Sequence, residues 1–371
     1  MNTIQTDVAI IGAGSAGLPA YRAAKAAGAS AILIEGGPHG TTCARVGCMP
    51  SKLLIAAAEA AYAARHTAPF GVHVDGVIRI DGREVMQRVK SERDRLVGFV
   101  LDSVEAIPAS DKLTGYARFI DDGLLQVGDH TRVRARSVVI ATGSSPVMPA
   151  KYRALGERAI INDDVFEWSD LPRKIAVVGA GVIGLELGQA LAHLGVNVTV
   201  IGARGRVGPL TDPAIKAYAA RTFQDSFRFE AEAEVEAVSR VGNEVQIRFR
   251  TGGEQAEDTF DYVLVTAGRK PNFDRLALHN TSLTLDHQGM PVYDPRTLQV
   301  GTQPVFIAGD ANGVLPLLHE AADEGRVAGT NAARFPDSTC TSTRLAGSLS
   351  ARNGSARTPS TSPTCSPGHC K

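Results

Sequence analysis

Two cysteines, Cys43 and Cys48, lie five residues apart in the run 40–52. A close thiol pair can form a reversible disulfide, so electrons could pass through sulfur. A straight helix would hold the two Cα atoms about 7.5 Å apart, whereas a disulfide needs roughly 7 Å or less. A redox pair therefore predicts a bend, which Gly47 permits. Spacing alone fits two ordinary buried thiols equally well.

A helix is predicted to begin beside the second cysteine. Residues 49–54 are typical of a helix start, with Pro50 inside the first turn. The positive end of that helix would favour a thiolate on Cys48.

The elements that would hold a nucleotide near these thiols begin at the start of the chain. An apolar strand, residues 7–11, leads directly into Gly12, Gly14 and Gly17 and then into an alanine-rich helix. The first glycine allows a tight turn, the second lets a pyrophosphate approach the backbone, and the third allows close helix packing. The next strand ends at Glu35, which is placed to accept hydrogen bonds from a ribose diol. The pattern predicts a dinucleotide site.

The pattern returns in the middle of the chain, where strand 174–178 precedes Gly179, Gly181 and Gly184. Two such units predict two dinucleotides, each with its phosphates at a helix N-terminus.

The second unit ends its next strand differently. Gly202 takes the place of an acid, and Arg204 and Arg206 follow. A missing carboxylate removes both the ribose hydrogen bonds and the repulsion of a 2′-phosphate, which arginines could bind. Two solvated loop arginines fit equally well, so NADH and NADPH both stay open.

Further elements follow from periodicity. Helical patterns cover residues 51–66 and 82–105, and strands run into glycine turns at 137–143 and 262–271. A strand at 305–308 ends beside an acid that could bind a sugar-alcohol hydroxyl or cap the following helix.

Composition limits the classes of function. The 371 residues are 44% hydrophobic, enough for two or three domains, and 39 basic residues balance 39 acidic ones. This balance argues against nucleic acid or an anionic membrane as partner. No basic leader and no long apolar stretch is evident, so we expect a cytoplasmic protein. No metal site is predicted.

Together these segments resemble the class I pyridine nucleotide-disulfide oxidoreductases, which include dihydrolipoyl dehydrogenase, glutathione reductase and mercuric reductase. The resemblance runs from about residue 7 to about residue 337 and depends on six motifs in the order that this family has. These motifs are residues 12–17, 43–52, 141–146, 179–184, 267–271 and 307–310.

The resemblance implies an α/β fold with two Rossmann-like domains, the NAD(P)-binding domain being inserted into the FAD-binding domain. The implied boundaries are 1–147 and 272–336 for the FAD-binding domain and 148–271 for the NAD(P)-binding domain. It also implies contacts with FAD and with NAD(P). The implied FAD contacts are Gly12, Gly14, Gly17, Glu35, Lys52, Gly143 and Asp310, and those to NAD(P) are Gly179, Gly181, Gly184, Arg204 and Gly268.

By the same resemblance, Cys43 is the interchange thiol that attacks a disulfide substrate, and Cys48 is the charge-transfer thiol against the flavin. Lys52 would lie near the flavin, paired with Glu186, because a buried ammonium needs an anionic partner to stay charged. The motifs look most like those of dihydrolipoyl dehydrogenases, with a small-molecule or lipoyl-type disulfide as substrate. A glutathione or mercuric reductase, or an inactive nucleotide-binding remnant, stays an alternative.

The composition changes after residue 337 to a mixture rich in Ser, Thr, Arg and Pro, which predicts a disordered tail over 337–371. Family members continue into a C-terminal domain that supplies the homodimer interface and an acid/base His–Glu pair. We expect a truncated chain with an aberrant tail, and therefore impaired disulfide turnover. A natural flexible tail is the alternative.

Overall fold

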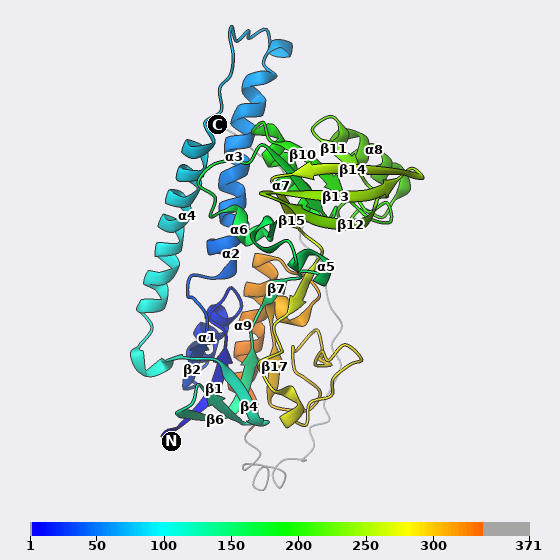
Figure 1. The fold of residues 1–371 in the computed structure, drawn as a ribbon. Coiled ribbons are helices and arrows are strands. Elements are labelled where there is room, and N and C mark those ends of the chain that lie inside the picture. Colours follow the sequence, from blue (N-terminus) through cyan, green and yellow to red (C-terminus); the bar gives the residue numbers. More distant parts are fainter. Residues whose placement is uncertain (1, 337–371) are drawn as a thin grey trace, which may run out of the picture. The chain divides into compact units, whose positions relative to one another are not determined.

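The computed structural model describes residues 2–336. The described residues up to Phe335 pack as one compact unit. The predicted disordered tail, 337–371, lies outside the described residues. Within this unit the chain builds a mixed, mainly parallel sheet, a parallel sheet, an antiparallel sheet and a helical hairpin (Figure 1).

The first sheet has seven strands in the order β3-β2-β1-β6-β5-β4, and β17 also pairs with β6. Strands β3, β2, β1, β6 and β17 are parallel, whereas β5 and β4 continue antiparallel. β6 is long enough to pair with β5 along its first residues and with β17 along its last. The strands are β1 (Asn2–Ile11), β2 (Ala31–Glu35), β3 (Lys112–Thr114), β4 (Ala117–Asp121), β5 (Leu124–Val127), β6 (Thr131–Ile140) and β17 (Val305–Ile307).

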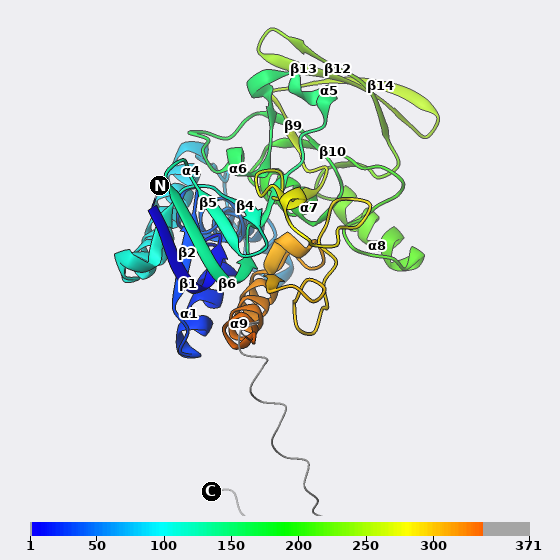
Figure 2. The same cartoon turned by 90° about the horizontal axis from the view of Figure 1, so that it is seen from below.

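Two helices lie side by side on one face of this sheet, α1 (Gly17–Ala26) and α9 (Leu318–Arg334) (Figures 1 and 2). Their backbones touch because small residues face each other. A Cβ added at Gly325 would lie 2.2 Å from the carbonyl oxygen of Ala16, and one added at Gly329 would lie 2.2 Å from that of Ala20. This contact fixes α9 against the helix that follows the first glycine-rich turn.

The second sheet has five parallel strands in the order β11-β10-β9-β15-β8. They are β8 (Ala159–Ile160), β9 (Lys174–Val178), β10 (Asn197–Ile201), β11 (Arg228–Glu230) and β15 (Tyr262–Val265). All five fall between β6 and β17 in the sequence, so the second unit is inserted into the first. The prediction of an α/β fold with one nucleotide-binding unit inside the other is confirmed.

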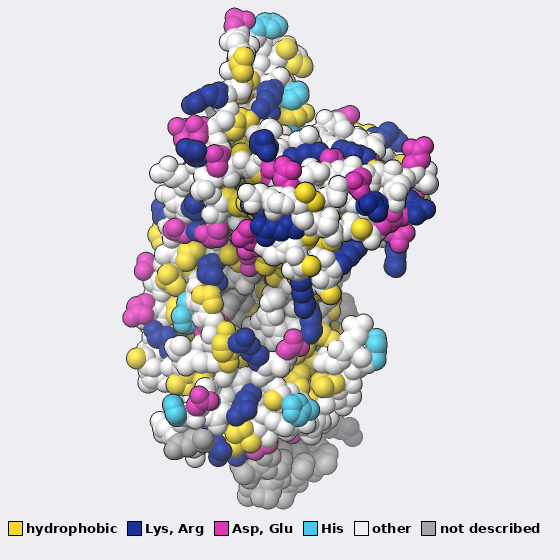
Figure 3. Space-filling model, viewed as in Figure 1, with side chains coloured by type: hydrophobic (Ala, Val, Ile, Leu, Met, Phe, Trp, Pro, Cys, Tyr) yellow, Lys and Arg dark blue, Asp and Glu magenta, His cyan; other side chains and the backbone are white. Residues whose placement is uncertain are grey.

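A further sheet and several helices belong to the inserted region. An antiparallel sheet of β12 (Glu234–Val241), β13 (Glu244–Thr251) and β14 (Glu254–Phe260) packs Val245, Ile247 and Phe249 into the core. The helices here are α5 (Ala150–Arg153), α6 (Asn162–Val165), α7 (Val182–His193) and α8 (Pro213–Gln224). On the face in Figure 3, basic and acidic side chains are interspersed rather than segregated, in keeping with the balanced composition.

The helical hairpin consists of α3 (Cys48–Arg65) and α4 (Gly82–Glu105). These bounds agree closely with the helices predicted over 51–66 and 82–105. A short helix, α2 (Thr42–Val46), leads into α3, and Gly47 separates the two. A two-stranded ribbon of β7 (Ser144–Pro146) and β16 (Arg269–Pro271) joins the segments that cross between the sheets. No helix in residues 2–336 combines the length and the apolar character needed to span a bilayer.

Candidate active site

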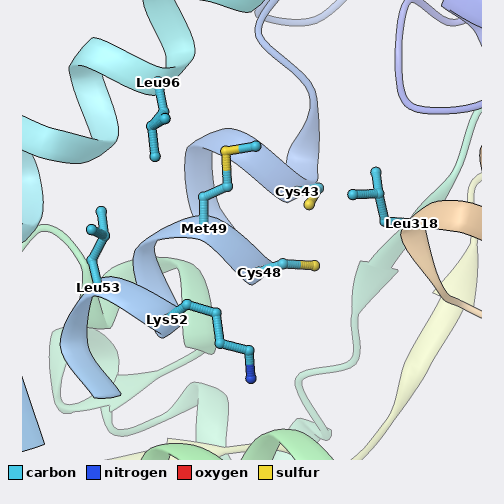
Figure 4. A pocket seen from close by; sticks show the side chains of 7 residues that line it. All are labelled: Cys43, Cys48, Met49, Lys52, Leu53, Leu96 and Leu318. Carbon is cyan, nitrogen blue, oxygen red and sulfur yellow. The ribbon is translucent and has the colours of Figure 1, made fainter. Parts of the chain in front are cut away.

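The two cysteines open into one cavity of about 290 Å³, lined by Cys43, Cys48, Met49, Lys52, Leu53, Leu96 and Leu318. Cys43 is in α2 and Cys48 is the first residue of α3. Figure 4 shows the two sulfur atoms directed into the same space, with Leu318 of α9 across from them. Both thiols are free, with Cys43 partly buried and Cys48 exposed.

The bend that a redox pair requires lies at Gly47. A Cβ there would lie 3.1 Å from the carbonyl oxygen of Thr42 and 3.2 Å from the Cα of Cys43, so a larger residue would push the two helices apart. Pro50 is in the first turn of α3, where its missing N–H costs no helical hydrogen bond. The predicted bend and helix start are both confirmed.

The two thiols differ in their ionisation. The hydrogen bond donated by Cys43 lowers the pKa of Cys48 to about 6, helped by the N–H groups at the helix start and by the charge of Lys52. The same hydrogen bond, with burial, raises the pKa of Cys43 above its usual range. The two opposite shifts favour ionisation of Cys48 over that of Cys43.

Lys52 lies one turn after Cys48, and its ammonium is paired with the carboxylate of Glu186. Glu186 comes from α7, the helix that follows the second glycine-rich turn. The ion pair joins the thiol-bearing helix to the second nucleotide unit, as the sequence predicts. The expectation of a buried ammonium is wrong, however, because the Lys52 side chain is 68% exposed.

The first glycine-rich turn has the form that a pyrophosphate requires. Gly12 has φ +110°, and a Cβ on it would lie 2.3 Å from the carbonyl oxygen of Ala141. A Cβ on Gly17 would lie 1.8 Å from the carbonyl oxygen of Gly12, so the helix starts against the turn itself. The Cβ direction of Gly14 is open. Gly12 and Gly17 therefore have no room for a side chain, whereas the space beside Gly14 is free for a ligand.

Glu35 ends β2 beside this turn. One carboxylate oxygen accepts the N–H of Ala13 at 2.7 Å, and the other accepts that of Gly37 at 2.7 Å. An ionised carboxylate can accept about four hydrogen bonds, so capacity for a ribose diol is left.

Asp310 lies just after β17, and its carboxylate accepts a hydrogen bond from Ser144 Oγ at 2.8 Å. Ser144 Oγ in turn accepts from Arg269 Nε at 2.8 Å. Gly143, next to Ser144, has φ +67° and turns the chain there. The sequence predicted Gly143 and Asp310 as site residues but not Ser144 and Arg269. The only local signal for these two is that each is a polar residue directly after a strand–glycine turn.

These features fit a flavin dinucleotide. The hydroxyl Oγ1 of Thr142 is buried and has no hydrogen-bond partner among residues 2–336, and Thr142 lies next to the turn at Gly12. An unpaired buried hydroxyl beside the glycine-rich turn is what a bound polar ligand would satisfy.

The second glycine-rich turn repeats the geometry. Gly179 has φ +115°, a Cβ on it would lie 2.5 Å from the carbonyl oxygen of Thr266, and one on Gly184 would lie 2.1 Å from that of Gly179. Gly181 is open, as Gly14 is. Gly268 has φ +119° after β15.

No carboxylate follows the second strand of this unit. Gly202 stands there, and a Cβ on it would lie 2.9 Å from the Cβ of Ala180. Arg204 and Arg206 are exposed, and Arg206 Nε donates to the carbonyl oxygen of Gly208 at 3.3 Å. Among the described residues, no cluster of three or more His, Cys, Asp or Glu side chains could hold a metal ion.

Comparison with known proteins agrees with this geometry. The sequence profile of the family described as pyridine nucleotide-disulphide oxidoreductase matches residues 6–325. The chain is 32% identical over 339 residues to the dihydrolipoyl dehydrogenase of Chlamydia trachomatis, covering 88% of this chain and 70% of that protein. It is 31% identical over 337 residues to the dihydrolipoyl dehydrogenase of Bacillus subtilis, covering 88% of this chain and 71% of that protein.

A similar solved structure is the Cu(II) complex of RclA, a HOCl-induced flavoprotein disulfide reductase from Escherichia coli. The two share 26% identity and a TM-score of 0.72, over 88% of this chain and 70% of RclA. The chain therefore belongs to the pyridine nucleotide-disulphide oxidoreductase family. It resembles dihydrolipoyl dehydrogenases in particular, and family membership implies FAD and NAD(P) as its cofactors.

Proposed function

We propose that this protein is an FAD-dependent NAD(P)H:disulfide oxidoreductase of the dihydrolipoyl dehydrogenase type, with Cys43 and Cys48 as its redox pair. One observation carries the proposal. Both thiols open into one cavity beside Lys52, and the partner of Lys52 is Glu186, on the helix of the second nucleotide unit. The reacting sulfurs, the flavin side and the nicotinamide side would thus meet at one place.

Bound FAD supplies a two-electron relay between NAD(P)H and a disulfide. The protein's own residues prepare the sulfurs for that exchange. Cys48 stays ionised at neutral pH, and Cys43 keeps a proton until it reacts. The carboxylate of Glu186 holds the Lys52 ammonium at the edge of the cavity, where a cation would favour electron density arriving on a neighbouring ring.

The cofactor contacts follow from the two turns. Gly12, Gly14 and Gly17 with Glu35 would hold the FAD pyrophosphate and ribose, and Gly143, Lys52 and Asp310 would hold the rest of that cofactor. The NAD(P) pyrophosphate would lie on the second turn and its ribose near the loop that follows β10. The residues proposed for NAD(P) are Gly179, Gly181, Gly184, Arg204 and Gly268.

The division into domains belongs to the same proposal. Segments 1–147 and 272–336 would form the FAD-binding domain and 148–271 the NAD(P)-binding domain. The sheet membership of the strands supports it, because β17 joins the first sheet after the whole second sheet has been completed.

A lipoyl-type disulfide is the proposed substrate class, supported by the similarity to dihydrolipoyl dehydrogenases. A glutathione disulfide reductase or a mercuric reductase is the second candidate, because two thiols on one cavity suit a soft cation as well as a disulfide. Assays of one preparation with lipoamide, glutathione disulfide and Hg(II) distinguish these three substrate classes.

For this 371-residue chain we propose slow disulfide turnover. The hydrogen bond to Cys48 and burial both raise the pKa of Cys43, which has to lose its proton to attack a disulfide. Among the described residues, no histidine lines the cavity to accept that proton. Loss of a general base typically costs roughly 10²- to 10⁴-fold in rate. Homodimer formation and a cytoplasmic location stay predictions.

The test is a spectrum followed by an assay. Purified protein should be yellow, and partial reduction should produce a long-wavelength band from the Cys48 thiolate and the flavin that Cys48→Ser abolishes. NAD(P)H should reduce artificial acceptors quickly and lipoamide slowly. A colourless protein that FAD fails to reconstitute would refute the proposal, and lipoamide turnover at the rate of full-length relatives would refute the slow step.

A further inference from the structure

The bend between the two cysteines is held by a residue from a distant part of the chain. Helix α2 ends at Val46, and a carbonyl in the last turn of a helix has no partner within that helix. Asn162 Nδ2 donates a hydrogen bond to the carbonyl oxygen of Val46 at 3.1 Å. The next residue is Gly47 and the one after it is Cys48.

Asn162 is suited to hold a fixed position. It is only 7% exposed, so its amide does not exchange this bond for water. The same nitrogen donates its other hydrogen to Asp163 Oδ1 at 2.9 Å, which leaves it no spare donor. Helix α6 starts at Asn162 and is capped by Asp164, which accepts the N–H of Ile161 at 2.9 Å.

Charged groups also lie near the contact between α6 and α2. Asp163 is partly buried, and burial raises its pKa, while Arg269 and Arg45 act in the opposite direction. Arg45 belongs to α2, so α6 faces α2 with a carboxylate as well as with the Asn162 amide. Because α6 follows β8 of the five-stranded sheet, the anchor of the thiol helices belongs to the second nucleotide unit.

We propose that Asn162 is a positioning residue for the redox pair, which holds the Val46 carbonyl and thereby sets how closely the Cys43 thiol approaches the sulfur of Cys48. This inference rests on the proposed function and adds to it a residue outside the motifs that carry the chemistry. Without the anchor, the end of α2 is free to move, and the hydrogen bond from Cys43 to Cys48 lengthens.

The test is the pH dependence of Cys48 alkylation, measured by iodoacetamide labelling and peptide mass spectrometry on the full chain. In the unmodified protein the labelling rate should rise through an inflection near pH 6. In Asn162→Ala the inflection should move up by about one pH unit or more, so labelling at pH 6 slows by about fivefold or more. The other groups that face Cys48 are Lys52 of α3 and Glu186 of α7, and the substitution leaves both in place, so that a shift reports on Cys43 of α2.

A matched control is Asn280→Ala. Asn280 Nδ2 also donates to a backbone carbonyl distant in sequence, that of Phe119 at 2.9 Å, but far along the chain from the thiols. This variant should lose similar stability and keep the inflection near pH 6. If Asn162→Ala does not fold, Asn162→Ser replaces it, because a shorter hydroxyl group fits the site but does not reach Val46.

An unchanged inflection in a folded Asn162 variant would overturn the proposal, as would an equal shift in Asn280→Ala. The measurement uses neither NAD(P)H nor a disulfide substrate. Failure of the proposed enzyme activity therefore shows in the assays above, and failure of this inference shows only in the labelling profile.

Discussion

The two glycine-rich turns have nearly the same backbone but lead to different chemistry. Gly12 and Gly179 have φ +110° and +115°. Gly12 lies against the carbonyl oxygen of Ala141, and Gly179 lies against that of Thr266. The N–H of Gly12 donates to Ile34, and that of Gly179 donates to Ile201, so Glu35 and Gly202 occupy equivalent positions. After Glu35 the chain enters the thiol helices, and after Gly202 it enters a loop with two arginines.

This difference shows which part of a nucleotide site is general. Phosphate binding depends on backbone shape and on a helix N-terminus, so it can be repeated with little constraint on side chains. Sugar recognition and redox chemistry depend on one position after the second strand and on the segment that follows. A substitution in one unit should therefore impair its nucleotide binding and leave that of the other unit intact.

The largest effect is expected from closing either turn. Gly12→Ala should abolish flavin binding, whereas Gly179→Ala should keep the flavin and slow its reduction by NAD(P)H by on the order of 100-fold or more, because the added Cβ meets a backbone oxygen. Flavin absorbance and stopped-flow reduction measure the two effects. Gly28→Ala is the control, since Gly28 has φ +85° but open space around its Cβ. Loss of flavin from Gly179→Ala would contradict the separation.

Removal of the Cys43 thiol should be next in size. In Cys43→Ala the pKa of Cys48 should rise from about 6 toward the ordinary thiol value of 9.0, because its main hydrogen-bond donor is gone. The lowered pKa stabilises the folded protein at alkaline pH, and this contribution is lost as pH falls through about 6. Urea unfolding at several pH values should show that dependence in the unmodified protein and not in the variant. A variant with unchanged pH dependence would mean that the helix end, not Cys43, sets the pKa.

The arginines of the second unit should give an intermediate effect. Arg204→Ala with Arg206→Ala should lower kcat/KM for NADPH roughly tenfold, since one charge-assisted hydrogen bond to phosphate contributes about 1.5–3 kcal/mol. The value for NADH should change little. Lys216→Ala with Arg221→Ala on α8 removes the same two positive charges elsewhere in the unit. Equal losses for both nucleotides would show that the arginines do not distinguish them.

The smallest effect is expected at the ion pair that joins the units. The carboxylate of Glu186 raises the pKa of Cys48, and the ammonium of Lys52 lowers it. Glu186→Gln should therefore shift the alkylation inflection down by a fraction of a pH unit, and Lys52→Gln should shift it up. Stability should fall by about 0.2–1 kcal/mol at most, because the lysine is largely exposed. Shifts of the same sign in both variants would contradict this account.

Local pattern was enough to predict the glycine turns, the helices at residues 51–66 and 82–105 and the helix start at Cys48. Each of these depends on residues within a few positions of one another, where backbone preferences act. The bond from Asn162 to Val46 and that from Ser144 to Asp310 join residues 116 and 166 positions apart. No periodicity encodes such pairs, because they arise only when the two sheets are assembled.

The role of the thiols was predictable in direction but not in detail. A helix start favours a thiolate on Cys48, yet the largest influence on its pKa is the Cys43 hydrogen bond, which requires the observed bend. The antiparallel sheet β12–β14 was not predicted, although β13 alternates core residues such as Ile247 with polar and charged ones, a pattern typical of a half-buried strand.

The position of β17 in the first sheet has a consequence for biosynthesis. The five-stranded sheet is complete once residue 265 has left the ribosome, whereas β6 receives its last partner only with residues 305–307. The inserted unit with the five-stranded sheet should therefore fold before the unit with the seven-stranded sheet, which is complete only when α9 covers α1. Until then the alanine-lined surface of α1 is open to water, and nascent chains stalled between these points should be the ones that chaperones retain.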